Sequence, residues 1–214
     1  MDNLSGRIQG QLDTPLDEVG REQARAVAPV IAAAAPACIV SSHLSRAYDT
    51  AVAVAELTGQ QPVVDPRLAE LHLGTWQGLT QAEARERHPE EHAAWRRGDD
   101  VRRGGGETYR EVGERAAASL REHLAAVPDA GTLLAVTHGG TARAALGALL
   151  ELPPQVLVRL VALGNCAWSV LVEGDVGWRL ERHGSTAVAS AAPVRTGPGD
   201  GSGQAVAPAA VRPL

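Results

Sequence analysis

Two apolar segments of this chain each run into a residue suited to binding an anion. ACIVSS (37–42) is followed by Arg46 at the expected start of a helix, and TLLAV (132–136) is followed by His138. A Gly-Gly pair beginning at Gly139 lets a ligand approach the backbone closely. Open α/β sheets bind ligands at the carboxyl ends of their strands, and helix N-termini favour negative charge. The spacing therefore predicts a phosphate site that needs no metal.

A carboxylate extends this candidate site. Arg46 would bind phosphate oxygens with its forked guanidinium, His138 would add a second donor, and Glu70, in LAELHLGTWQG, would protonate the leaving alcohol. Each residue also has a purely structural interpretation: Arg46 paired with Asp49 or Glu22, His138 in the core, Glu70 as a solvated loop carboxylate. Their shared position at strand-to-loop junctions favours the catalytic interpretation, although the set lacks a nucleophile.

Alternating strands and helices must position these residues. Periodicity and capping signals predict a three-layer α/β sandwich, with a mainly parallel central sheet and helices on both faces. The helices are expected at 15–35, 45–59, 79–88, 89–97, 108–127 and 140–152, and the strands at 37–42, 61–64, 132–137, 167–174 and 176–183. The segment 65–78, which contains Glu70, is expected to be a long loop.

Composition excludes several function classes. The 214 residues carry a net charge of -5, so no basic stripe is available for nucleic acid. No apolar run approaches membrane-spanning length and no signal peptide is evident, which predicts a cytoplasmic protein. Cys38 and Cys166 lie in apolar runs and are expected to be core thiols. Residues 1–186 are expected to form one domain, and the Ala/Pro/Gly-rich stretch 187–214 a disordered tail.

Five motifs in order resemble the histidine phosphatases, also called phosphoglycerate mutase-like proteins. They are the segment 3–24, SSHLSRAYDTA, LAELHLGTWQG, GGGET and VTHGG. The resemblance extends from Asn3 to about Thr186 and implies a phosphoglycerate mutase-like fold. It also implies Arg46, Glu70 and His138 as catalytic residues. By the same analogy, Asn3, Gln9, Gly10, Arg46 and Gly139 would contact the substrate.

The resemblance implies a two-step phosphoryl transfer that uses neither metal nor cofactor. An upstream histidine would attack phosphorus, Arg46 and His138 would hold the oxygens, and Glu70 would shuttle the proton. The partner is therefore expected to be a small phosphorylated metabolite. A phosphoglycerate mutase is the first alternative, with Arg96 and Arg97 clamping a second phosphate, and an inactive phosphate-binding homologue is the second. Nothing in the sequence indicates the substrate or the oligomeric state.

The family begins with a strand ending in Arg-His-Gly, and this chain is expected to start just after that strand. Its histidine would lie a few residues before Met1, so the chain as written should be inactive, through either a misplaced gene start or a real truncation. The missing strand is expected between 37–42 and 132–137, leaving a slot that another strand fills or that promotes association. Arg-His-Gly at 182–184 imitates the motif, but its alternating strand is typical of a sheet edge rather than the centre.

Overall fold

The computed structural model describes residues 6–157, 159–187 and 207–213. Its strands form one six-stranded sheet in the order β2-β1-β3-β6-β4-β5. Their bounds are β1 Cys38–Ser41, β2 Val63–Val64, β3 Leu133–Thr137, β4 Trp168–Gly174, β5 Gly177–Ser185 and β6 Ala207–Pro213. The pairs β2–β1, β1–β3 and β6–β4 are parallel, whereas β3–β6 and β4–β5 are antiparallel.

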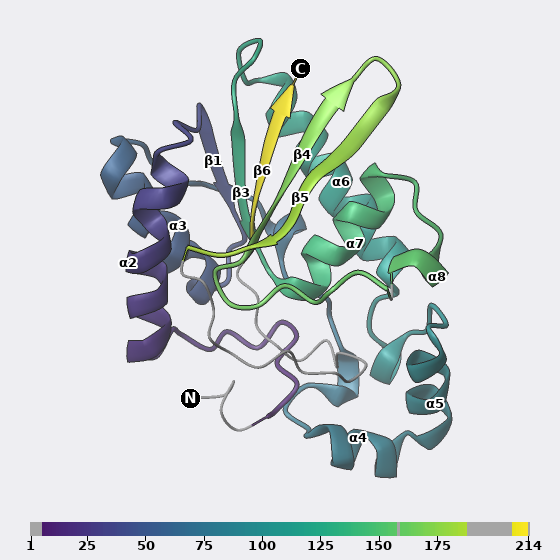
Figure 1. The fold of residues 1–214 in the computed structure, drawn as a ribbon. Helices are drawn as coiled ribbons and strands as arrows, with labels where there is room; N and C mark the ends of the chain where they lie inside the picture. The colour runs from purple at the N-terminus through teal and green to yellow at the C-terminus, as the bar shows by residue number, and fades with distance from the viewer. Residues whose placement is uncertain (1–5, 158, 188–206, 214) are drawn as a thin grey trace.

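Long helices cover both faces of this sheet (Figure 1). They are α2 Glu18–Ala32 and α3 Ser45–Thr58 on one face, and α6 Tyr109–Ala125 and α7 Gly139–Leu149 on the other. Successive strand residues point to opposite faces, so Ile39 packs with α2 and α3 while Val40 packs with α6 and α7. Each fully buried aliphatic side chain contributes about 1.5–3 kcal/mol. The predicted three-layer α/β architecture is confirmed.

Local capping explains where these helices begin and end. Asp17 caps α2 by accepting a hydrogen bond from the amide of Gly20 at 2.8 Å. Thr108 and Glu111 form a capping box at the start of α6. The helix α3 ends at Gly59, whose left-handed conformation suits glycine.

Short helices gather beyond the carboxyl ends of β1 and β3, at the lower edge of the sheet in Figure 1. They are η1 Pro66–Leu68, η2 Gly74–Trp76, α4 Gln81–Arg87, α5 Pro89–Arg97 and η3 Arg103–Gly105; α8 Pro154–Leu157 follows α7. Trp76 is fully buried among them and stacks on His92. Arg103 lies over the rings of Trp95 and Tyr109, at 5.3 and 5.2 Å from the centroids. None of the helices in the described ranges has the length and apolar character needed to cross a membrane.

Two expectations about the sheet are wrong. The strands β1 and β3 pair directly, Cys38 opposite Leu133, so no slot separates them. The place between β3 and β4 is filled by β6, which pairs with both. Residues 207–213 are therefore a central strand and not part of a disordered tail. The rest of the expected tail beyond residue 187, namely 188–206 and 214, lies outside the described residues.

Candidate active site

His138 separates β3 from α7 and is almost completely buried, with 1% of its surface exposed. Its Nε2 lies 2.9 Å from Ser42 Oγ, and that hydroxyl also accepts a hydrogen bond from the Leu44 amide at 3.2 Å. Burial and then the positive charge of Arg46 hold the pKa of His138 well below its ordinary value. The imidazole is therefore neutral at pH 7, and its Nδ1 has no hydrogen-bond partner in the described part of the chain.

Arg46 lies in the first turn of α3, directly after β1, and is 1% exposed. Its guanidinium donates to the carbonyl oxygens of Leu12 at 2.8 Å and Gly10 at 2.9 Å. Burial lowers the pKa of Arg46, while the negative charges of Glu70 and Asp13 act in the opposite direction. Its Nε is buried and finds no acceptor among the residues that the structure describes. Arg46 is thus a buried cation whose Nε has no partner in the described part of the chain.

Glu70 is in the loop after η1, and its carboxylate lies at the N-terminus of α7. Its carboxylate accepts hydrogen bonds from the amides of Leu71 at 2.7 Å, Gly140 at 3.2 Å and Thr141 at 3.0 Å. A Cβ on Gly140 would lie 2.6 Å from Glu70 Oε1, so glycine is required for this approach. The helix end that was predicted to attract an anion holds the carboxylate of Glu70.

The N-terminal loop joins these groups. The main-chain amide of Gln11 donates to Gln77 Oε1 at 2.9 Å, and its side-chain Nε2 donates to the main-chain carbonyl of Glu70 at 2.9 Å. Gly10 has a φ of +54°, and a Cβ there would lie 2.3 Å from Gln77 Oε1. Gln9 is buried, and its Oε1 has no partner within the described ranges. The loop therefore lies between Arg46 and Glu70 and links the two.

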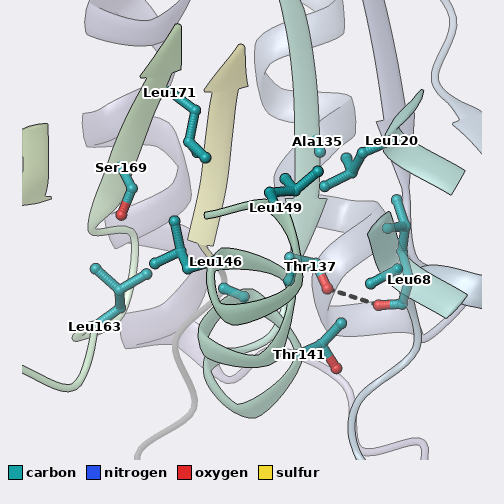
Figure 2. A pocket seen from close by; sticks show the side chains of 13 residues that line it. Leu68, Leu120, Ala135, Thr137, Thr141, Leu146, Leu149, Leu163, Ser169 and Leu171 are labelled. Atoms are coloured by element: carbon teal, nitrogen blue, oxygen red, sulfur yellow. Dashed lines mark hydrogen bonds between the residues drawn. The ribbon is translucent and has the colours of Figure 1, made fainter. Parts of the chain in front are cut away.

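The main chain beside Glu70 is also held from the interior. Thr137 Oγ1 donates to the Leu68 carbonyl at 2.7 Å, and Thr141 Oγ1 donates to the Ala69 carbonyl at 2.7 Å. Figure 2 shows the Thr137–Leu68 bond beside an apolar cavity of about 20 Å³ between the sheet and helices α6 and α7. A cavity of this size holds about one water molecule, so it is no substrate site.

These contacts form a candidate anion site at the carboxyl ends of β1 and β3. Buried polar atoms are nearly always hydrogen-bonded, and Arg46 Nε and His138 Nδ1 have no partner in the described part of the molecule, so both could bind a ligand. The positive charge of Arg46 favours a negatively charged ligand. Glu70 stands beside it as a proton donor or acceptor. Within the described ranges, no group of three or more His, Cys, Asp or Glu side chains is placed to hold a metal.

The structure brings most of the predicted site residues together. Arg46, Glu70 and His138 lie at one sheet edge, Gln9 and Gly10 lie on the adjoining loop, and Gly139 is the first residue of α7. Asn3 lies outside the described residues. Sequence reasoning missed Ser42, Gln11 and Gln77 as site residues, although Ser42 and Gln77 belong to the motifs SSHLSRAYDTA and LAELHLGTWQG.

His183 of the second Arg-His-Gly segment already has two hydrogen-bond partners. It lies on the edge strand β5, with Nδ1 2.8 Å from Ser169 Oγ and Nε2 2.8 Å from the Val161 carbonyl. Both ring nitrogens are therefore occupied, and β6 and β4 separate this strand from β3. The position matches the expected edge strand and does not suit a nucleophile facing Arg46.

A sequence profile of the histidine phosphatase superfamily (branch 1) matches residues 1–186. A glucosyl-3-phosphoglycerate phosphatase of Mycolicibacterium vanbaalenii is 41% identical over 198 residues, covering 84% of this chain and 87% of that protein. A probable phosphoglycerate mutase of Yersinia enterocolitica is 35% identical over 194 residues, covering 86% and 88%. The structure of a mycobacterial glucosyl-3-phosphoglycerate phosphatase with VO3 superposes with a TM-score of 0.79 at 41% identity, covering 86% of this chain and 93% of that one.

Proposed function

Because the chain belongs to the histidine phosphatase superfamily, whose phosphatase relatives support phosphomonoester hydrolysis, we propose that it hydrolyses glucosyl-3-phosphoglycerate through a phosphohistidine. One observation carries the proposal: Arg46 Nε and His138 Nδ1 are buried without partners among the described residues, at a sheet edge where an anion would satisfy both. The substrate is taken from the phosphatase relative, which matches at 41% identity against 35% for the mutase. A mutase activity is the weaker alternative.

The proposed reaction has two balanced steps. The histidine of an Arg-His-Gly segment ahead of Asn3, which is not among the 214 residues, forms an N–P bond as the P–O ester bond breaks. Glu70 gives its proton to the leaving alkoxide. Glu70 then takes a proton from water, whose oxygen attacks phosphorus while the N–P bond breaks. Arg46 and His138 hold the equatorial oxygens, and the positive charge of Arg46 offsets the negative charge that grows on them.

Phosphate release from glucosyl-3-phosphoglycerate, 3-phosphoglycerate and phosphoserine tests the proposal. We expect the 214-residue chain to bind vanadate but release no phosphate. A chain extended through its Arg-His-Gly segment should favour glucosyl-3-phosphoglycerate at least about tenfold in kcat/KM. Arg46→Ala in that extended chain should lose about 100-fold or more in kcat, because one charge-stabilising donor is removed.

Three outcomes would contradict this assignment. Turnover by the 214-residue chain that disappears in His183→Ala would place the nucleophile on β5. Conversion of 3-phosphoglycerate to its isomer without release of phosphate would favour a mutase. If the extended chain binds vanadate but turns over none of the three substrates, the protein would be an inactive phosphate-binding homologue.

A further inference from the structure

The segment that carries Glu70 is irregular, so its position must be set by contacts from other elements. Residues 69–73 follow η1 and belong to neither strand nor helix. The Glu70 carboxylate must nevertheless lie over the amides of Gly140 and Thr141. Any shift of this main chain would move the carboxylate away from the candidate anion site.

Arg115, on α6, binds the carbonyl side of this segment. One of its terminal nitrogens donates to the carbonyl oxygens of Arg67 at 2.5 Å and Ala69 at 2.9 Å, and the other donates to that of Glu70 at 3.2 Å. A planar guanidinium can reach three acceptors at once in this way. The compact ammonium of a lysine cannot reproduce that geometry.

Glu107 completes the attachment on the far side of Glu70. Its carboxylate accepts from Arg115 Nε at 2.8 Å and from a terminal nitrogen of Arg115 at 3.0 Å, and it also accepts from the His72 amide at 2.9 Å. The Glu107 amide donates to the His72 carbonyl at 2.9 Å. The two side chains are only 20% and 25% exposed, so solvent competes weakly with this forked pair.

We propose that Arg115, paired with Glu107, is a positioning residue that holds Glu70 for proton transfer, an inference that rests on the proposed function. The pair contacts the main chain at residues 67, 69 and 70 on one side of the carboxylate and at residue 72 on the other. It does not touch the carboxylate itself, whose hydrogen bonds come from Leu71 and α7. Arg115 therefore acts through the main chain of Glu70.

Amide hydrogen exchange tests the positioning in the 214-residue chain without any turnover. The amides of Gly140 and Thr141 donate to Glu70, so their exchange rates report whether the carboxylate stays in place. Arg115→Gln should accelerate exchange at both amides at least about tenfold. Arg121→Gln, at an exposed arginine of the same helix, is the matched control and should leave both rates unchanged.

Leaving-group dependence tests the consequence for proton transfer. In the chain extended through its Arg-His-Gly segment, Arg115→Gln should lose about 30-fold or more in kcat on an alkyl phosphate. This loss is within the usual contribution of a positioned general acid. It should lose less than about threefold on 2,4-dinitrophenyl phosphate, whose leaving group needs no proton. KM should change little, and Arg115→Lys should restore only part of the loss. Glu107→Gln should add little in the double variant, because the two residues act as a unit.

Equal losses on both substrates, or unchanged exchange at Gly140 and Thr141, would overturn the positioning role. Should Arg115→Gln not fold, Arg115→Lys carries the same two measurements. Failure of the proposed function is recognised separately, because the chain extended through its Arg-His-Gly segment, with Arg115 unchanged, would then hydrolyse neither substrate. In that case the exchange rates still decide whether Arg115 holds Glu70.

Discussion

At the scale of single residues, the candidate site combines one fixed cation with one neutral imidazole. Arg46 and His138 are both almost fully buried, and the charge of Arg46 is among the causes that keep His138 unprotonated. A second buried positive charge would be costly without an anion beside it. A bound phosphate dianion would supply the negative charge that stabilises a protonated His138. Ligand binding and protonation of His138 should therefore be coupled.

The neutral state of His138 predicts a pH dependence of stability. Below a pH of about 6.5, an unfolded histidine takes up a proton that native His138 does not. The free energy of unfolding therefore decreases as the pH is lowered. The slope from this residue is about 1.4 kcal/mol per pH unit until its native pKa is reached. Urea unfolding in phosphate-free buffer from pH 7 to 5 should show this slope in the parent chain minus the His138→Asn variant. Parallel curves would contradict the assignment.

Some of these residues could be predicted and others could not, for a physical reason. Arg46 and His138 follow buried strands, so a rule about strand ends finds them. Ser42, Arg115 and Glu107 matter only because segments far apart in sequence meet: Ser42 contacts a histidine 96 positions away, and Arg115 reaches residues 45 to 48 positions away. Local pattern carries no signal for such contacts.

At the scale of elements, two glycine-containing turns fit closely against each other beside the Glu70 segment. A Cβ on Gly106 would lie 2.0 Å from the His72 carbonyl oxygen, and one on Gly74 would lie 1.8 Å from that of Gly104. Both obstacles are backbone atoms, which cannot move aside as a side chain can. Any larger residue would therefore separate η2 from η3.

Gly106→Ala should destabilise the protein by about 1–3 kcal/mol, the usual cost of overpacking. The clash is between backbone segments, because the Cβ would meet the carbonyl oxygen of His72. Gly164→Ala is the matched control, since a Cβ there meets nothing within 4 Å. It should stay within about 0.5 kcal/mol of the parent. Urea denaturation measures both, and equal stability of the two variants would be the contrary result.

Helices were predictable because their caps and apolar periodicity are written locally, as in Thr108–Glu111 and the buried positions of α6. The strand β6 was not, because its sequence APAAVRP has the composition of a linker. Proline is rare inside central strands, yet Pro208 and Pro213 stand near the two ends of β6. This segment is a strand because its backbone pairs with β3 on one side and with β4 on the other.

At the scale of the whole molecule, β6 connects the two halves of the sheet. On one side it pairs with β3 from Leu133↔Val211 to Thr137↔Ala207, and on the other it pairs with β4 from Ser169↔Ala209 to Glu173↔Pro213. Without it, β3 and β4 would each present an unpaired edge at the centre of the sheet. Unpaired edges invite pairing with other chains.

A chain lacking residues 207–214 should therefore be less stable and should associate. The lost ladders amount to roughly 5 kcal/mol at about 0.5–1.5 kcal/mol for each hydrogen bond, equivalent to about 10–20 °C in melting temperature for a domain of this size. Calorimetry and size-exclusion chromatography measure the two effects. Replacing residues 207–213 by a Gly/Ser segment of equal length should reproduce both. A monomer that melts with the full chain would show that β6 does not hold the sheet together.

The position of β6 also determines when the sheet can close during synthesis. Pro213 lies 76 positions after Thr137, so at about 5–20 residues per second the ribosome adds β6 roughly 4–15 s after β3 is complete. Throughout that interval the nascent β3 has an open edge, and β4 also has one once it is complete at Gly174. Pairing across so many residues is also slow. Newly made chains should therefore depend on chaperones for those seconds, and translation speed after residue 137 should influence how much of the protein folds.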